Sequence, residues 1–396
     1  MSRYPMPAVE RAMKVQEVIL KAASGQITWA DAAEILGVTC RTMRRWKLRY
    51  VHRGYDGLFD RRRQQPSPRR VPLAVVEHVL RLYRGPYAGF NVRHFHEKLA
   101  AAHGITLSYQ WVKLALQGAG LVPQRAKRGP HRQRRERRPL RGMMLYADGS
   151  THAWLPTVAG TQDLILIMDD ANSEVYSACL VEEEGSLTTM AGVKEVVATR
   201  GIFCSLYTDR GSHFFHTPKV GGEVARGELT QIGCALQALG IQHIASYCPQ
   251  GRGRIERTFG TWQGRLPQEL RAAGITTMEQ ANVYIRQQFI PWHNAELKVA
   301  AAQPGDAFVP CGALDLDAIF CLQHERSVAA DNTVSFGTRR LQIGPSAWRV
   351  SFAKCRVKVC EHLDGHLSIR YGPHVLGRYA ADGLALEEKS KRAKAA

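Results

Sequence analysis

Apolar residues recur at helical spacing over residues 9–51, with one break at Gly37. Thr39 follows the break and is a residue type that caps helices, so we expect a second helix to begin there. The apolar positions of this second helix recur at steps of three and four: Met43, Trp46 and Tyr50. The pattern predicts a helix-turn-helix domain over residues 1–60.

A second set of helical patterns occupies residues 72–121, where three apolar stripes follow one another and Ser108 can cap the third. We therefore expect a second helix-turn-helix domain, of the winged kind, over residues 72–123. Two linked modules of this type would read a long DNA site.

The spacing changes to that of strands at Met143. Three strand-like segments are followed by a helix, a buried strand, a second helix, a short strand and a third helix. These segments are 143–155, 163–170, 174–180, 188–199, 202–207, 229–239, 241–244 and a helix that starts after Gly251. The succession β-β-β-α-β-α-β-α is the order of an RNase H-like fold, so we expect a multidomain α/β chain with such a core at 142–300.

The C-terminal part begins with an amphipathic helix over residues 276–300 and continues with short strand-like segments separated by turns. The predicted strands are 333–336, 348–350, 356–359 and 367–371, with a hairpin turn at Asp364 and Gly365. We expect a small β-barrel domain over residues 301–385, followed by a charged tail at 386–396.

Charge is distributed unevenly along the 396 residues, whose formal net charge is +19. Residues 1–141 carry 29 Lys and Arg against 9 Asp and Glu, whereas residues 142–396 carry 25 against 26. Such an excess predicts that the first third binds a polyanion, because basic residues that neutralise phosphates release condensed counterions. With 45% hydrophobic and 22% charged residues the chain is expected to fold, and it contains no stretch long enough to cross a membrane. Nine scattered cysteines favour reduced thiols and a cytoplasmic location.

Two basic linkers separate the predicted domains, at residues 61–71 and 124–141. The second contains nine Lys and Arg between Arg125 and Arg141 and has no apolar periodicity. We expect its arginines, such as Arg134 and Arg135, to bind DNA phosphates.

Arginines also follow one face of the predicted helix after Thr39. They fall away from the apolar positions and would face a major groove. The residues are Arg41, Arg44, Arg45 and Arg49.

Three acidic residues stand where an RNase H-like fold brings its strands and last helix together. Asp148 lies in the first strand, Asp209 follows the fourth, and Glu256 lies early in the helix after Gly251. Carboxylate oxygens bind hard divalent cations, and two Mg²⁺ about 3.5–4 Å apart can activate an attacking hydroxyl and stabilise a leaving oxygen. The sequence therefore predicts a two-metal magnesium site, in which Mn²⁺ is an alternative.

Four segments of this region resemble the DDE transposase and integrase superfamily, and most closely the ISNCY-type insertion-sequence transposases. They are ADGS at 147–150, LILIMDDANS at 164–173, YTDRGSHF at 207–214 and SYCPQGRGRIERTFG at 246–260. The resemblance implies that Asp148, Asp209 and Glu256 form the catalytic, metal-binding triad. The interval between the last two is longer than in many relatives, which indicates an insertion at about 216–230.

Other polar residues of the region have competing interpretations. Asp169 and Asp170 are expected to be structural or secondary, and the acidic run 182–184 to be a solvated turn. Arg254 and Arg257 are candidates for DNA phosphate contacts, and His213 flanks the site. A zinc site is disfavoured, because its four candidates lack the short knuckle spacing of structural zinc sites. Those candidates are Cys355, Cys360, His362 and His366.

These features together predict a DNA transposase that binds the ends of its element and catalyses metal-dependent strand nicking and strand transfer. Its partners would be the terminal inverted repeats and target DNA, with a homo-oligomer assembled on the DNA. The first alternative is a non-catalytic, transposase-derived regulator, which would have no use for three carboxylates. The second is a tyrosine or serine recombinase, which the three-strand opening disfavours.

Overall fold

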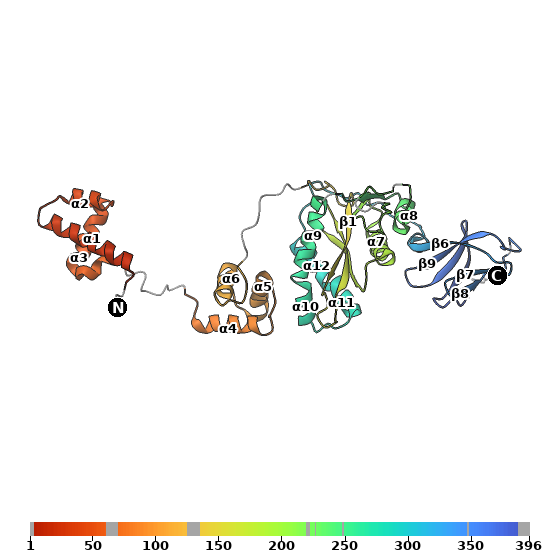
Figure 1. The fold of residues 1–396 in the computed structure, drawn as a ribbon, viewed down its shortest axis with the longest axis horizontal. Helices are drawn as coiled ribbons and strands as arrows, with labels where there is room; N and C mark the ends of the chain where they lie inside the picture. The colour runs from red at the N-terminus through yellow and green to blue at the C-terminus, as the bar shows by residue number, and fades with distance from the viewer. Residues whose placement is uncertain are drawn as a thin grey trace, which may run out of the picture. The chain divides into compact units, whose positions relative to one another are not determined.

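The structure is a computed structural model that describes residues 4–60, 70–124, 135–218, 222–225, 227–247, 249–346 and 348–386 (Figure 1). It divides into two compact units, residues 1–78 and 79–396. The boundary lies within α4 (Leu73–Arg84). Within the described residues, no helix combines the length and apolar character that a membrane span requires.

The first unit contains α1 (Met6–Ala23), α2 (Trp29–Ile35), α3 (Cys40–Arg53) and a short 3₁₀ turn (Gly54–Leu58). Its core is built from one apolar face of each α-helix, including Val15, Ile19, Ala33 and Met43. Thr39 caps α3 by accepting the Thr42 N–H, so the predicted helix-turn-helix is confirmed.

A second break, absent from the prediction, separates α1 from α2. Thr28 and Asp31 form a reciprocal cap there, in which each side chain accepts the other's backbone N–H. This capping box starts a new helix, whereas the apolar stripe continues across the break and conceals it.

The second module consists of α4, α5 (Val92–His103) and α6 (Tyr109–Gly118). Asn91 caps α5, and Ser108 caps α6 as predicted. Residues 70–124 form no strand, so the expected winged module is corrected here to a three-helix module.

Polar contacts join α5 to α10 (Leu266–Ala272), which follows the predicted carboxylates along the chain. His94 Nε2 and Lys98 Nζ each lie 2.8 Å from a carboxylate oxygen of Glu269. Arg265 Nη2 donates to Glu97 Oε2 at 2.5 Å. The second module therefore packs on the region that carries the predicted carboxylates.

A five-stranded sheet forms the centre of the second unit, in the order β3-β2-β1-β4-β5. Its strands are β1 (Leu145–His152), β2 (Gln162–Asp169), β3 (Val175–Val181), β4 (Ser205–Thr208) and β5 (Gln242–Ala245). The first three are antiparallel, whereas β4 runs parallel to β1 and β5 parallel to β4. The predicted strand and helix succession is confirmed. The fourth strand starts later than expected, because Ile202 pairs with Val309 instead.

Helices cover both faces of this sheet (Figure 1). One face packs against α9 (Pro249–Gln263), α10, α11 (Met278–Tyr284) and α12 (Ile290–Glu296). The other packs against α7 (Ser186–Arg200) and α8 (Gln231–Ala238). Tyr146 belongs to the first core and its neighbours Leu145 and Ala147 to the second, as the alternation of a central strand requires.

The amphipathic segment 276–300 is interrupted by a π-helical turn (Ile285–Phe289) between α11 and α12. Pro291 lies in the first turn of α12 and has no N–H to donate, which breaks the regular ladder at this point.

The C-terminal region contains α13 (Leu316–Ile319) and six strands around one apolar core. A four-stranded sheet has the order β11-β10-β9-β6, and β7 pairs only with β8. The strands are β6 (Cys321–Ser327), β7 (Thr333–Phe336), β8 (Arg339–Gln342), β9 (Arg356–His362), β10 (Leu367–Tyr371) and β11 (His374–Tyr379). Because the described strands form two separate sheets, the predicted closed β-barrel is not confirmed.

The expected strand at 348–350 is wrong. Trp348 and Val350 are exposed, and the described sheets contain no strand between Gln342 and Arg356. The hairpin turn at Gly365 forms as predicted, with φ of 83° and antiparallel pairing of β9 with β10.

Candidate active site

Asp148 projects from β1, the central strand of the sheet, and is 5% exposed. Side chains two residues apart on a strand share a face, so Asp148 lies on the same face as Tyr146. The Tyr146 hydroxyl oxygen lies 3.1 Å from the Gly251 carbonyl oxygen of α9. The carboxylate therefore lies on the side of the sheet that α9 covers.

Asp209 follows β4 directly, and the register of the two parallel strands brings it beside Asp148. Tyr146 pairs with Tyr207, and each aspartate lies two residues further along its own chain segment. The Asp209 side chain is 37% exposed and accepts the Gly211 N–H at 2.8 Å.

Glu256 lies on α9, whose buried stripe consists of Ile255, Phe259 and Trp262. Glu256 itself is exposed. Arg252 lies one turn earlier, and residues four apart on a helix are neighbours on its surface. Both side chains flank the buried stripe on the same side.

Arg252 joins the predicted carboxylates. Its guanidinium donates to Asp148, and its Nη1 lies 3.6 Å from Asp209 Oδ2. Burial opposes the charge of Arg252, but the hydrogen bond to Asp148 and the charges of Asp148, Asp209 and Glu256 raise its pKa. The positive charge of Arg252 is thus stabilised by the negative charges of carboxylates from three separate segments of the chain.

The pKa of Asp148 is raised to about 6. Burial is the main cause, and the negative charges of Asp209 and Glu184 add to it, whereas the hydrogen bond from Arg252 lowers it. A carboxylate in these surroundings is stabilised by an added cation.

Glu184 was expected to lie in a solvated turn, but its side chain is 25% exposed and faces β1. A β-carbon at Gly149 would lie 2.1 Å from Glu184 Oε2. Its other oxygen lies 3.3 Å from His213 Nε2. The acidic run gave no sequence indication that one of its members turns inward, and we correct that expectation for Glu184.

Asp169 and Asp170 are fully buried. Asp169 accepts hydrogen bonds from two backbone N–H groups and the Tyr176 hydroxyl. Asp170 accepts from the Tyr146 hydroxyl, the Arg138 N–H and the guanidiniums of Arg135 and Arg254. These two carboxylates hold the end of the basic linker against the sheet.

The predicted DNA-binding arginines fall into three groups. Those of α3 are all exposed: Arg41, Arg44, Arg45 and Arg49. Arg257 is exposed on α9, whereas Arg135 and Arg254 are bound to Asp170 inside the second unit. Arg134 lies outside the described residues, as does part of the predicted insertion at 216–230.

The zinc candidates of the C-terminal region have separate partners. His362 bonds to Ser368 and to the Asp317 carbonyl, and His366 pairs with Asp364. Arg349 donates to the Cys355 sulfur.

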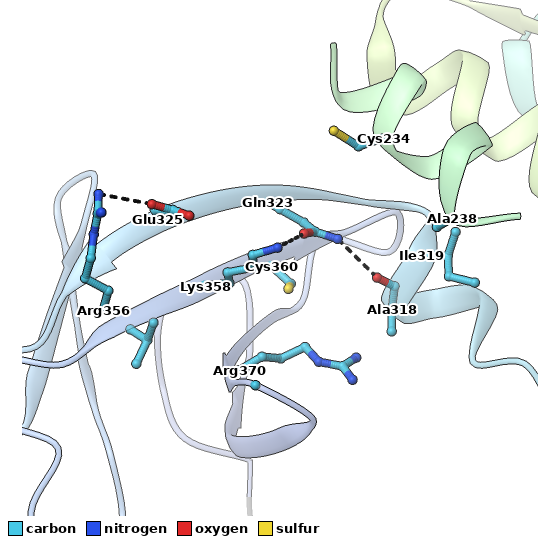
Figure 2. Close-up of a pocket in the computed structure, with 12 residues that line it drawn as sticks. Cys234, Ala238, Ala318, Ile319, Gln323, Glu325, Arg356, Lys358, Cys360 and Arg370 are labelled. Carbon is cyan, nitrogen blue, oxygen red and sulfur yellow. Dashed lines mark hydrogen bonds and ion pairs between the residues drawn. The ribbon is translucent and has the colours of Figure 1, made fainter. Parts of the chain in front are cut away.

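A cavity of about 470 Å³ lies between α8 and the C-terminal sheet (Figure 2). Its charged lining residues are Glu325, Arg356, Lys358 and Arg370. Lys358 donates to Gln323, and Arg356 pairs with Glu325, as the dashed lines in Figure 2 show. None of the three predicted catalytic carboxylates lines this cavity.

Comparison with known proteins finds two family models that match the N-terminal part of the chain. Residues 42–116 match a homeodomain-like domain, and residues 16–67 match a helix-turn-helix domain. Among solved structures, the HTLV-2 integrase catalytic core domain in complex with magnesium has a TM-score of 0.30 and 17% identity, over 41% of this chain and 93% of that one. A simian T-cell lymphotropic virus intasome in complex with the PP2A regulatory subunit B56 gamma has a TM-score of 0.32 and 15% identity, over 71% of this chain and 91% of that one.

Two relatives are similar along much of their sequence. The chain is 28% identical over 369 residues to "Putative transposase y4bF" of Sinorhizobium fredii (strain NBRC 101917 / NGR234), a match that covers 93% of this chain and 80% of that protein. It is 26% identical over 303 residues to the transposase for insertion sequence IS1202 of Streptococcus pneumoniae, covering 68% of this chain and 64% of that protein. The predicted resemblance to transposases is thereby confirmed: the chain is similar to a putative transposase over 93% of its length and to an insertion-sequence transposase over 68%.

Proposed function

We propose that this chain is a DNA transposase whose catalytic carboxylates are Asp148, Asp209 and Glu256. The observation that carries the proposal is that Asp148 and Asp209 meet at one guanidinium, that of Arg252, on which the charge of Glu256 also acts. They come from β1, from the end of β4 and from α9. A structural ion pair needs one carboxylate, whereas phosphodiester chemistry needs several at one place.

The donor set fits divalent magnesium, because all three side chains offer the hard oxygen ligands that this ion prefers. The raised pKa of Asp148 indicates that a buried negative charge lacks full compensation even beside Arg252. Asp148, Asp209 and Glu256 would hold two Mg²⁺ ions, which when bound supply activation of a hydroxyl and stabilisation of a leaving oxygen.

The residues around the carboxylates suit a nucleic-acid substrate. Arg257 is exposed one residue after Glu256, and a guanidinium at this position can bind a DNA phosphate next to the reacting one. Asp148 is only 5% exposed, so water screens its charge little. A water would first cleave a phosphodiester at the element end, leaving a 3′-hydroxyl and a 5′-phosphate. The 3′-hydroxyl would then attack a phosphodiester of target DNA and displace a 3′-hydroxyl of the target strand.

We propose the following division of labour along the chain. Residues 1–60 and 72–123 read the element ends, residues 61–71 and 124–141 bind phosphates, and residues 142–300 carry the chemistry. The C-terminal residues 301–385 would contact DNA or a neighbouring subunit of a homo-oligomer, and 386–396 form a tail. The exposed arginine face of α3 supports the first assignment.

The test is a cleavage and strand-transfer assay with Mg²⁺ and duplexes that carry the DNA flanking the gene. Asp148→Asn, Asp209→Asn and Glu256→Gln keep side-chain shape and should each abolish both steps while DNA binding persists. Glu183→Gln removes an exposed carboxylate from the neighbouring turn and should leave activity unchanged.

The alternatives predict other results. A non-catalytic regulator would bind the DNA without cutting it under any metal condition, and a recombinase with a nucleophilic hydroxyl would form a covalent protein–DNA product without metal. Normal activity of Glu256→Gln would remove that residue from the site.

A further inference from the structure

Arg252 occupies the place between two carboxylates that the proposed metal ions would need. Its guanidinium donates to Asp148 through one terminal nitrogen and lies 3.6 Å from Asp209 through the other. Among the described residues, no three acidic, histidine or cysteine side chains are arranged to hold a metal ion. The carboxylates are therefore arranged around a guanidinium.

The carboxylates that receive Arg252 are the proposed ligands of the divalent cation. A ligated cation lies about 2.0–2.1 Å from each oxygen and brings two positive charges. It would repel a guanidinium held against the same oxygens. Arg252 and a metal ion would thus compete for Asp148 and Asp209.

Arg252 has the freedom to leave. It lies in the first turns of α9, its side chain is 27% exposed, and the charges that stabilise its guanidinium are those of the proposed catalytic carboxylates. Arg254, two residues later, is 14% exposed and is fixed by Asp170 and by the Arg135 carbonyl. The two arginines therefore differ: Arg254 is tied to a fully buried carboxylate, whereas Arg252 is more exposed and its partners are the proposed metal ligands.

A DNA phosphate at this site offers Arg252 a new anionic partner with the geometry that a guanidinium fork prefers. Transfer of Arg252 from the carboxylates to a phosphate would free their oxygens. Binding of DNA would then strengthen binding of metal, and by thermodynamic reciprocity metal would strengthen binding of DNA by the same factor.

We propose that Arg252 is an internal counter-ion that competes with divalent metal for Asp148 and Asp209 and is transferred to a DNA phosphate when the site is loaded. This inference rests on the proposed function, because it takes these carboxylates as the metal ligands. It makes Arg252 a positioning residue that couples metal loading to the presence of DNA.

The test measures Mn²⁺ binding to the full chain by electron paramagnetic resonance, with and without a short double-stranded DNA of random sequence. Without DNA, Arg252→Gln should bind Mn²⁺ at least about fivefold more tightly than the unchanged protein, the lower end of typical coupling between sites. Arg286→Gln removes an exposed positive charge elsewhere on the same unit and should bind Mn²⁺ like the unchanged protein. DNA should increase the Mn²⁺ affinity of the unchanged protein by a larger factor than that of Arg252→Gln.

Arg252→Lys keeps the positive charge but not the two-pronged geometry of the guanidinium. Its Mn²⁺ affinity should therefore fall between those of the unchanged protein and Arg252→Gln. It also carries the test if Arg252→Gln fails to fold, as judged by thermal unfolding. The inference is overturned if the variants bind Mn²⁺ no more tightly than the unchanged protein while Asp148→Asn abolishes binding, and the proposed metal site then stands. If no form of the protein binds Mn²⁺ with or without DNA, the inference and the metal chemistry of the proposed function both fall.

Discussion

Gly251 of α9 packs directly against Tyr207 of β4, so that a β-carbon at position 251 would lie 2.1 Å from the Tyr207 hydroxyl oxygen. The same hydroxyl bonds to Ser246 at 2.9 Å, which holds the ring in place. The close approach fixes the start of α9, and with it Arg252 and Glu256, against the strand that leads to Asp209.

Gly251→Ala should therefore push the start of α9 away from β4. We expect a loss of about 1–3 kcal/mol in the free energy of unfolding, as for other overpacked sites, and a loss of strand-transfer activity. The matched control is Gly253→Ala, where a β-carbon meets nothing within 4 Å. In a helix this change should stabilise by about 0.5–1 kcal/mol. Urea unfolding of the two variants measures the difference, and equal effects would contradict the role of the contact.

The lowered pKa of the buried His243 side chain should make the stability of the protein depend on pH. Burial, aided by the charge of His213, lowers the pKa of His243 to about 4 in the folded protein. The unfolded chain takes up a proton near pH 6.5, which the folded protein resists. This contribution to stability is therefore present above pH 6.5 and is lost as the pH falls from 6.5 to about 4.

Unfolding measured across this pH range should show a steeper loss for the unchanged protein than for His243→Gln. Glutamine does not titrate and can still bond to Thr208, which lies 3.0 Å from His243 Nε2. Parallel pH profiles of the two proteins would show that another group is responsible.

Asp170 is the fully buried partner of Arg135 and Arg254. Asp170→Asn removes its charge and leaves two guanidiniums without compensation, so we expect a loss of about 3–5 kcal/mol in the free energy of unfolding. Asp306→Asn removes one partner of an exposed ion pair with Arg141 and should cost only about 0–1 kcal/mol. Calorimetry should rank the two variants clearly. A small effect at Asp170 would mean that the linker end detaches without consequence for the core.

The exposed arginines of α3 predict sequence-specific binding of DNA. Arg44→Ala should reduce the preference for element-end DNA over random DNA by about 1–3 kcal/mol, the usual value of a base contact. Lys14→Ala changes an exposed charge on α1 and should leave the ratio of the two affinities unchanged. Titrations with both DNAs at several salt concentrations measure the ratio. Arg134→Ala removes an arginine that is expected to bind a DNA phosphate. This variant should instead lower the slope of affinity against salt concentration, on logarithmic scales, by about one unit.

An equal loss of both affinities in Arg44→Ala would contradict α3 as the reading helix. The second module would then be the candidate, although its last helix carries one basic residue, Lys113.

Local sequence determined most elements of this fold, because a helix or strand is fixed by spacing and by its end residues. Thr39 and Ser108 cap helices where the pattern indicated, and the five strands of the sheet follow the predicted order. Errors arose where a local pattern had a tertiary alternative. Trp348 and Val350 alternate like a strand but remain exposed, since no neighbouring strand among the described residues accepts them.

The candidate site divides in the same way. The sequence by itself determined which residues are candidates for the chemistry: one aspartate within a strand-like segment and one after another, the glutamate on the following helix and the arginine face of α3. Only the tertiary structure decided which of them meet. Arg252 reaches Asp148 across 104 residues of sequence, and Glu184 turns toward Gly149 from a run that reads as solvated. The physical reason is that periodicity assigns a side chain to a face of its own element, whereas its partner is set by how distant elements pack.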